Sequence, residues 1–169
     1  MATVNDLLLD ALDRVKESVH GVVGRLSDQQ LATRVAPDAN TVAWLVWHLT
    51  RIMDDHIAAV QGDEQVWTDQ GWAGRFGLPF DPGATGYGQA PGEVAQVRVT
   101  ADLLLGYYDA AHDYVVGVIG TVTEADLDRI VDRRWDPPVT LAVRLVSVVN
   151  DATQHVGQAA YVAGILDRS

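Results

Sequence analysis

The segment Thr41-Val-Ala-Trp-Leu-Val-Trp-His-Leu49 is apolar on nearly every side of the helix that its pattern predicts. Asn40 or Thr41 can cap the exposed backbone N–H groups of the first helical turn. The helical pattern continues to about Val60. A helix that is hydrophobic all round belongs in the middle of a fold rather than on its surface. The sequence therefore predicts a central helix with other elements packed around it.

Three further segments carry apolar residues at the three- and four-residue steps of an amphipathic helix. They lie at about residues 5–26, 100–119 and 140–166. Patterns typical of β-strands are almost absent, apart from a brief extended segment at 130–135. A short acidic helical turn is expected at 123–128. We expect an all-α protein: an up-and-down four-helix bundle in which residues 1–169 form a single domain.

A long crossover loop rich in glycine and aromatic residues is expected between the second and third helices, at about 62–97. A loop of this length inside a compact domain is usually functional or disordered. Its aromatic residues argue against disorder, because their apolar area needs a core or a cleft to cover. They are Trp67, Trp72, Phe76, Phe80 and Tyr87. We expect a packed loop, with short helical turns.

Composition excludes several functions. The chain has no cysteine, which rules out disulfides, thiolate metal sites and a cysteine nucleophile. Twelve basic and 23 acidic residues give a net charge of −11, so nucleic acids and anionic membranes are poor partners. Phosphate-binding glycine motifs and the G-x-S-x-G elbow are absent. Without a signal peptide or an apolar run near the roughly 20 residues of a membrane span, we expect a cytoplasmic protein.

The fourth helix carries a polar stripe directly beside its apolar stripe, formed by Arg144, Asp151, His155 and Gln158. Such a position predicts side chains that point inward or into a cleft at the edge of the core. Asp151 and His155 are four residues apart, a spacing that lets two ligands on one helix reach the same ion. An imidazole nitrogen and a carboxylate oxygen suit zinc or a similar divalent transition metal.

His48 is the best candidate for a third ligand, because it lies among apolar neighbours on the central helix. His56 lies about 12 Å further along that helix and cannot reach the same ion. Other interpretations remain open on the residues alone. The histidines can be satisfied core residues, Asp151 and His155 can form an ordinary helix pair, and Arg144 can be the ion-pair partner of Asp151.

A stripe of mostly small residues follows the back of the fourth helix. It consists of Val146, Asn150, Thr153, Gly157, Ala160 and Gly164. Small residues allow helices to approach closely, so the stripe predicts either tight packing inside the bundle or a homodimer interface.

Four blocks of sequence together resemble the DinB-like superfamily. They are Thr41–Leu49, Gly71-Trp-Ala-Gly-Arg-Phe-Gly-Leu-Pro79, Trp135-Asp-Pro-Pro-Val-Thr140 and Asp151-Ala-Thr-Gln-His-Val-Gly-Gln158. Within the superfamily, the chain is most similar to an actinobacterial, DUF664-type branch related to mycothiol-dependent maleylpyruvate isomerase and to bacillithiol and mycothiol S-transferases.

This resemblance implies a four-helix bundle with a divalent transition metal (zinc, nickel or iron) at one end, often in a homodimer. The usual ligands in the superfamily are one histidine of the second helix and an H-x-x-x-H pair of the fourth. The matching positions here are His48, Asp151 and His155, with aspartate in place of the first histidine of the pair. A carboxylate there resembles the E-x-x-x-H form of mycothiol-dependent maleylpyruvate isomerase.

Three protein ligands leave an open position on the metal, as in catalytic sites. The resemblance implies a metal-dependent S-transferase or isomerase for a low-molecular-weight thiol of the mycothiol type, acting through a metal-bound thiolate. Its partners would be a small-molecule thiol and an electrophile. We expect Arg144, Gln158 and Trp44 to be substrate-binding residues. The alternatives are a metal-dependent hydrolase and a non-catalytic dimeric binding protein.

Overall fold

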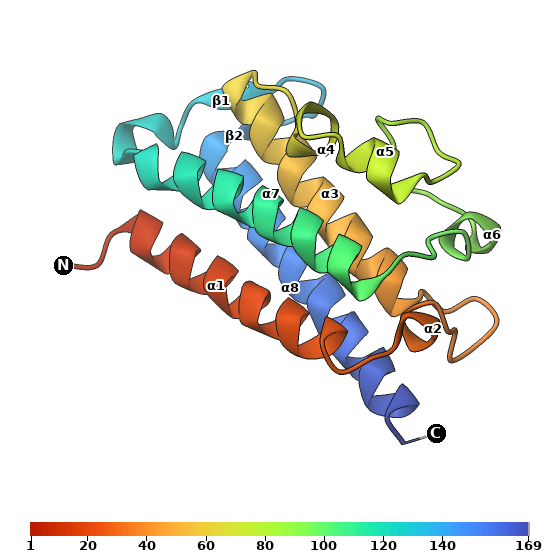
Figure 1. The fold of residues 1–169 in the computed structure, drawn as a ribbon. Coiled ribbons are helices and arrows are strands. Elements are labelled where there is room, and N and C mark those ends of the chain that lie inside the picture. The colour runs from red at the N-terminus through yellow and green to blue at the C-terminus, as the bar shows by residue number, and fades with distance from the viewer. Residues whose placement is uncertain (169) are drawn as a thin grey trace.

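A computed structural model describes residues 1–168 of the chain, whose regular secondary structure is helical apart from one small hairpin (Figure 1). The long helices are α1 (Val4–Val23), α3 (Val42–Gln61), α7 (Ala101–Thr121) and α8 (Leu141–Leu166). The short ones are α2 (Asp28–Leu31), α4 (Val66–Asp69), α5 (Trp72–Phe76), α6 (Pro91–Val94) and a 3₁₀ turn at Glu124–Asp126. The antiparallel strands are β1 (Ile130–Asp132) and β2 (Val139–Thr140). The predicted all-α class is confirmed.

The four long helices pack against one another: α3 contacts α7 and α8, and α1 contacts the same two helices. In Figure 1, α1 and α8 run in one direction while α3 and α7 run in the other. The strict alternation expected of an up-and-down order is therefore interrupted once, because the long crossover returns the chain before α7 begins. Within residues 1–168, no helix combines the length and the hydropathy required to cross a bilayer.

Each long helix begins at a threonine whose side-chain oxygen accepts a hydrogen bond from the backbone N–H three residues later. These caps are Thr3, Thr41, Thr100 and Thr140. α1 ends at Val23, earlier than the predicted residue 26, because the chain leaves the helix at Gly24. Every residue of α3 from Val42 to Asp54 is buried, which confirms the predicted central helix.

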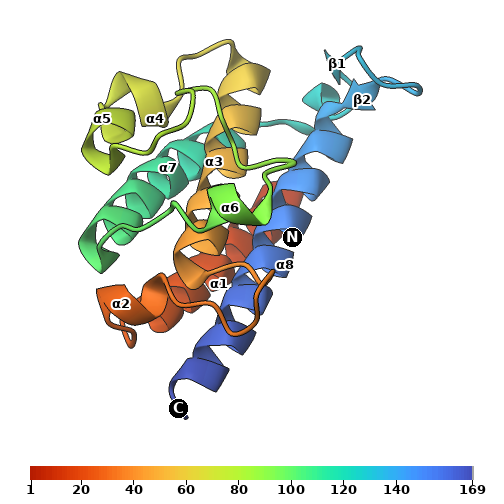
Figure 2. The same cartoon turned by 90° about the vertical axis from the view of Figure 1, so that its right-hand side faces the viewer.

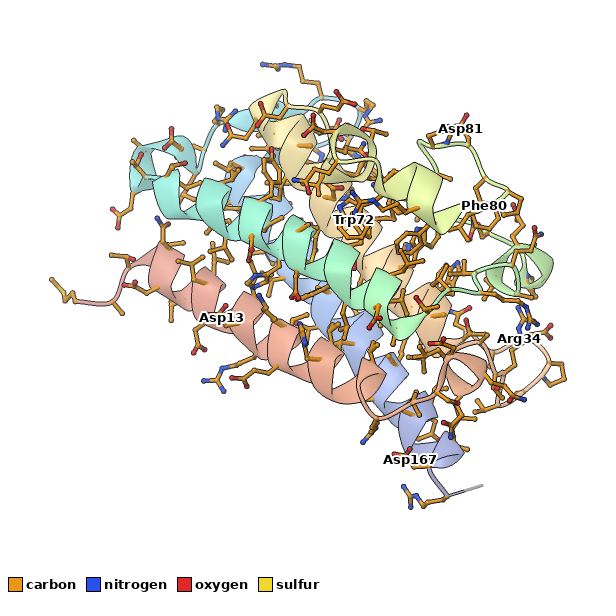
Figure 3. The ribbon with its side chains drawn as sticks, in the orientation of Figure 1. Asp13, Arg34, Trp72, Phe80, Asp81 and Asp167 are labelled. Atoms are coloured by element: carbon orange, nitrogen blue, oxygen red, sulfur yellow. The ribbon has the colours of Figure 1, made fainter. Side chains whose placement is uncertain are left out.

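The crossover between α3 and α7 is packed, as expected, and it contains α4, α5 and α6. Trp67 is 3% exposed and contacts the rings of Trp47 and Tyr107. Trp72 lies between α5 and α7 (Figure 3), where its ring meets Tyr107. The buried carboxylate of Asp54 accepts backbone N–H bonds of 2.8 Å at the start of α4. The crossover is thus part of the core.

We expect Trp67→Ala to lower the free energy of unfolding by about 3–5 kcal/mol, because it removes a large ring from a packed cluster. Urea denaturation measures this change. Tyr87 is the matched control: it lies in the same crossover but is 88% exposed, so Tyr87→Ala should change stability by less than about 0.5 kcal/mol. Equal effects of the two substitutions would show that the crossover does not belong to the core.

Candidate metal centre

His48 of α3 and Asp151 and His155 of α8 form a cluster whose nitrogen and oxygen atoms all lie within 4.8 Å of one another. We call these three residues the ligand cluster. The His48 side chain is buried, and the other two are partly buried. The structure therefore brings together the three residues that the sequence predicts as metal ligands.

The orientation of the His48 ring is fixed from both sides. Its Nδ1 lies 2.6 Å from the carbonyl oxygen of Thr85, in the crossover. A carbonyl only accepts, so Nδ1 carries the proton and Nε2 keeps a free lone pair. The Trp44 ring stacks on the imidazole with centroids 4.7 Å apart, and its Nε1 donates to Gln89. Burial lowers the pKa of His48, which favours the neutral form that binds metals.

The Oδ1 atom of Asp151 lies 3.5 Å from Nε2 of His155. This interaction raises the pKa of His155. The other oxygen, Oδ2, is buried and has no hydrogen-bond partner among the residues that the structure describes. Burying an unpartnered carboxylate oxygen costs free energy, which a cation beside it would offset. Two imidazoles and a carboxylate are a donor set for zinc and similar divalent ions. The cluster therefore fits a divalent metal.

Of the two remaining residues in the predicted polar stripe on α8, Gln158 lies at the ligand cluster and Arg144 does not. Gln158 stays beside the cluster, with its Oε1 atom 3.2 Å from Nδ1 of His155. Arg144 does not pair with Asp151, as one interpretation proposed, but donates to the buried Asp132 over 3.0 Å. This correction has a simple cause, because the β1–β2 hairpin brings Asp132 over the start of α8. Trp44 supports the His48 ring, and its predicted contact with substrate stays a prediction.

Four of the six residues in the stripe of small residues are exposed, whereas Ala160 and Gly164 are partly buried. Val146 is 63% exposed, and Asn150, Thr153 and Gly157 are exposed as well. Of the two interpretations, tight packing inside the bundle is therefore wrong for these four positions. The homodimer interface stays a prediction.

The sequence patterns did not predict that a part of the crossover, at Thr85, contacts the His48 ring and fixes its orientation. The buried Arg51 donates from Nε to the carbonyl of Ala84 over 3.1 Å, next to Thr85. Gly86 has a φ of +94°, and a Cβ atom there would lie 2.8 Å from Nδ1 of His48. The glycine-rich composition was the one available signal. In Figure 2 the crossover passes in front of α3 toward α8, which brings it to the cluster.

The chain is similar to a known protein family and to solved structures. A family model described as mycothiol-S-transferase matches residues 7–168. The crystal structure of a protein described as the conserved protein of a locus from Enterococcus faecalis is similar over 100% of both chains, with 30% sequence identity and a TM-score of 0.93. No curated protein matches the chain.

We expect Gly86→Ala to weaken the binding of zinc by about 10- to 100-fold, because the new methyl group pushes the Thr85 carbonyl away from His48. Gly88→Ala is the matched control, since Gly88 also has a positive φ but its added Cβ would meet no atom within 4 Å. Both variants carry the same kind of backbone strain. Calorimetric zinc titration compares them, and equal affinities would contradict the positioning of His48 by the crossover.

Proposed function

This chain belongs to the mycothiol-S-transferase family, and we propose that it is a metal-dependent enzyme that transfers a low-molecular-weight thiol of the mycothiol type to an electrophile. The observation that carries the proposal is the ligand cluster itself. Two histidines and Asp151 converge there, and the carboxylate has one buried oxygen without a partner in residues 1–168. We propose His48, Asp151 and His155 as the metal ligands and zinc, nickel or iron as the metal.

Three protein ligands leave at least one position open for a substrate. A divalent cation at the cluster would lower the pKa of a thiol and hold it as the nucleophilic thiolate. The thiol must come from another molecule, because this chain has no cysteine.

The residues around the ligand cluster contribute orientation. The carbonyl of Thr85 and the side-chain oxygen of Gln158 each lie within hydrogen-bond distance of an Nδ1 atom, of His48 and His155 respectively. The Thr85 carbonyl favours the His48 tautomer whose Nε2 is free to bind the metal. Nε2 of His155 pairs with Oδ1 of Asp151, and a bound metal would replace the proton between these two atoms. The stacked Trp44 and the crossover cover His48, which is 5% exposed.

The arrangement of the helices supports two further proposals, on the type of fold and on the oligomeric state. We propose that the four packed helices form a bundle of the DinB-like type, whose long crossover makes α3 and α7 parallel. We also propose a homodimer in which a second copy packs on the exposed N-terminal part of the stripe on α8, around Val146 and Asn150. Val146 is 63% exposed there, and the nearby Val143, which is outside the stripe, is 53% exposed.

We expect tag-free protein to contain about one divalent zinc, nickel or iron ion per chain, measured by elemental analysis. His48→Ala and Asp151→Ala should lose the metal, because two remaining ligands hold an ion poorly. His56→Ala is the matched control, since His56 lies on the same helix and pairs with Asp55 instead. Wild-type protein without metal, even after reconstitution, would contradict the metal centre.

We expect the metal-loaded protein to consume mycothiol in the presence of an electrophile, followed as loss of free thiol. Chelation should reduce the rate to the uncatalysed background and zinc should restore it, while His48→Ala should stay at background. Breakdown of the electrophile without any thiol would indicate a hydrolase. Unchanged turnover in His48→Ala would refute the proposed role of the ligand cluster.

A further inference from the structure

A cavity of about 460 Å³ lies between α8 and the chain that connects α2 to α3. Figure 2 shows that connection beside the C-terminal part of α8. The lining is mainly apolar and includes Val35, Ala39, Leu45, Gly157, Gln158 and Val162. We call it the apolar cavity. Its volume is in the range of small-molecule sites.

The apolar cavity borders the ligand cluster. Leu45 comes three residues before His48 on α3, and Gln158 comes three residues after His155 on α8. Each step is about 4.5 Å along a helix axis. Because α3 and α8 run in opposite directions (Figure 1), both steps lead to the same side of the cluster. The Oε1 atom of Gln158, in the cavity wall, lies 3.2 Å from Nδ1 of His155.

The opposite side of the cluster is polar. A second cavity of about 190 Å³ lies between α3, α8 and the β1–β2 hairpin, and Asp55, His56, Asp132 and Arg144 line it. We call it the polar cavity. His56 and Arg144 are about two helical turns from the ligand on their own helix. An apolar group placed there would bury charged side chains at a cost in free energy. In the described part of the chain, an apolar group beside the cluster therefore fits the apolar cavity.

We propose that the apolar cavity binds the hydrocarbon part of the electrophilic substrate while its reactive carbon lies at the ligand cluster. This inference rests on the proposed function and names the substrate class: small electrophiles with an apolar chain or ring. A terminal epoxide illustrates the reaction. The thiol sulfur forms a bond to the terminal carbon, the C–O bond breaks, and the oxygen keeps its electron pair and takes the proton that the thiol loses.

The first experiment measures binding without chemistry. We titrate 1-octanol and follow methyl NMR signals of the cavity residues Val35 and Leu45. The test variant is Gly157→Leu, whose side chain would enter the cavity mouth and whose Cβ would meet no atom within 4 Å. Gly117→Leu on α7 is the control, because its Cβ also meets no atom. Octanol should bind wild type and the control equally, and Gly157→Leu at least tenfold more weakly.

The second experiment measures turnover of mycothiol with terminal epoxides from 1,2-epoxypropane to 1,2-epoxyoctane. In wild type and Gly117→Leu, kcat/KM should rise by up to about fourfold per methylene, as burial of each group predicts. In Gly157→Leu the increase with chain length should disappear. Metal content, measured in all three proteins, shows whether the ligand cluster is intact.

The outcomes separate this inference from the proposed function. Absence of octanol binding, or an unchanged dependence on chain length in Gly157→Leu, overturns the inference while turnover of epoxypropane still supports the transferase. If octanol binds but no epoxide is turned over with mycothiol, both the proposed transferase function and this inference are overturned. If sedimentation shows a wild-type dimer that Gly157→Leu converts to a monomer, a second copy covers the cavity and the inference fails.

Discussion

The hydrogen bond between Nδ1 of His48 and the carbonyl of Thr85 connects the most buried helix of the protein to its longest connection. Without it the imidazole has no fixed tautomer, and Nε2 is not reserved for a metal. The bond requires the crossover backbone to come close to α3, and Gly86 permits that approach because a side chain there would collide with the ring. The geometry of the ligand cluster thus depends on how the crossover packs.

The crossover is held in turn by a buried polar group of α3. Asp54 accepts two backbone N–H bonds from the start of α4 and one from the Tyr107 hydroxyl, and Arg51 donates to the Ala84 carbonyl. Burial raises the pKa of Asp54 despite these bonds, so the charge carries a desolvation cost. Arg51 and Asp54 also form a buried ion pair, with Nη1 of Arg51 3.7 Å from Oδ2 of Asp54, and a buried ion pair adds little stability. Its contribution here is specificity, because it fixes which backbone atoms face His48.

The four long helices were predictable because each has its own apolar periodicity, and the cap at Asn40 or Thr41 also marked the start of α3. The ligand cluster was predictable because Asp151 and His155 lie beside the apolar stripe of α8, whereas solvated charges usually lie opposite it. The partners of Thr85 and Arg144 were not predictable, since they depend on where an irregular backbone passes another element. The contact between His20 of α1 and Asp109 of α7 was not predictable for the same reason, because it joins two helices and leaves no local pattern in the sequence.

The surroundings of the contact between α3 and α8 are apolar on one side of the ligand cluster and polar on the other. Because the two helices are antiparallel, each contributes residues to both sides. Arg144 and His56 make one side polar, Leu45 and Val162 make the other apolar, and the ligand cluster lies between them. A polar thiol and an apolar electrophile have opposite solvation requirements, so neither gains by entering the cavity that suits the other. On the proposed function, their reacting atoms can therefore meet at the cluster without competition for one cavity.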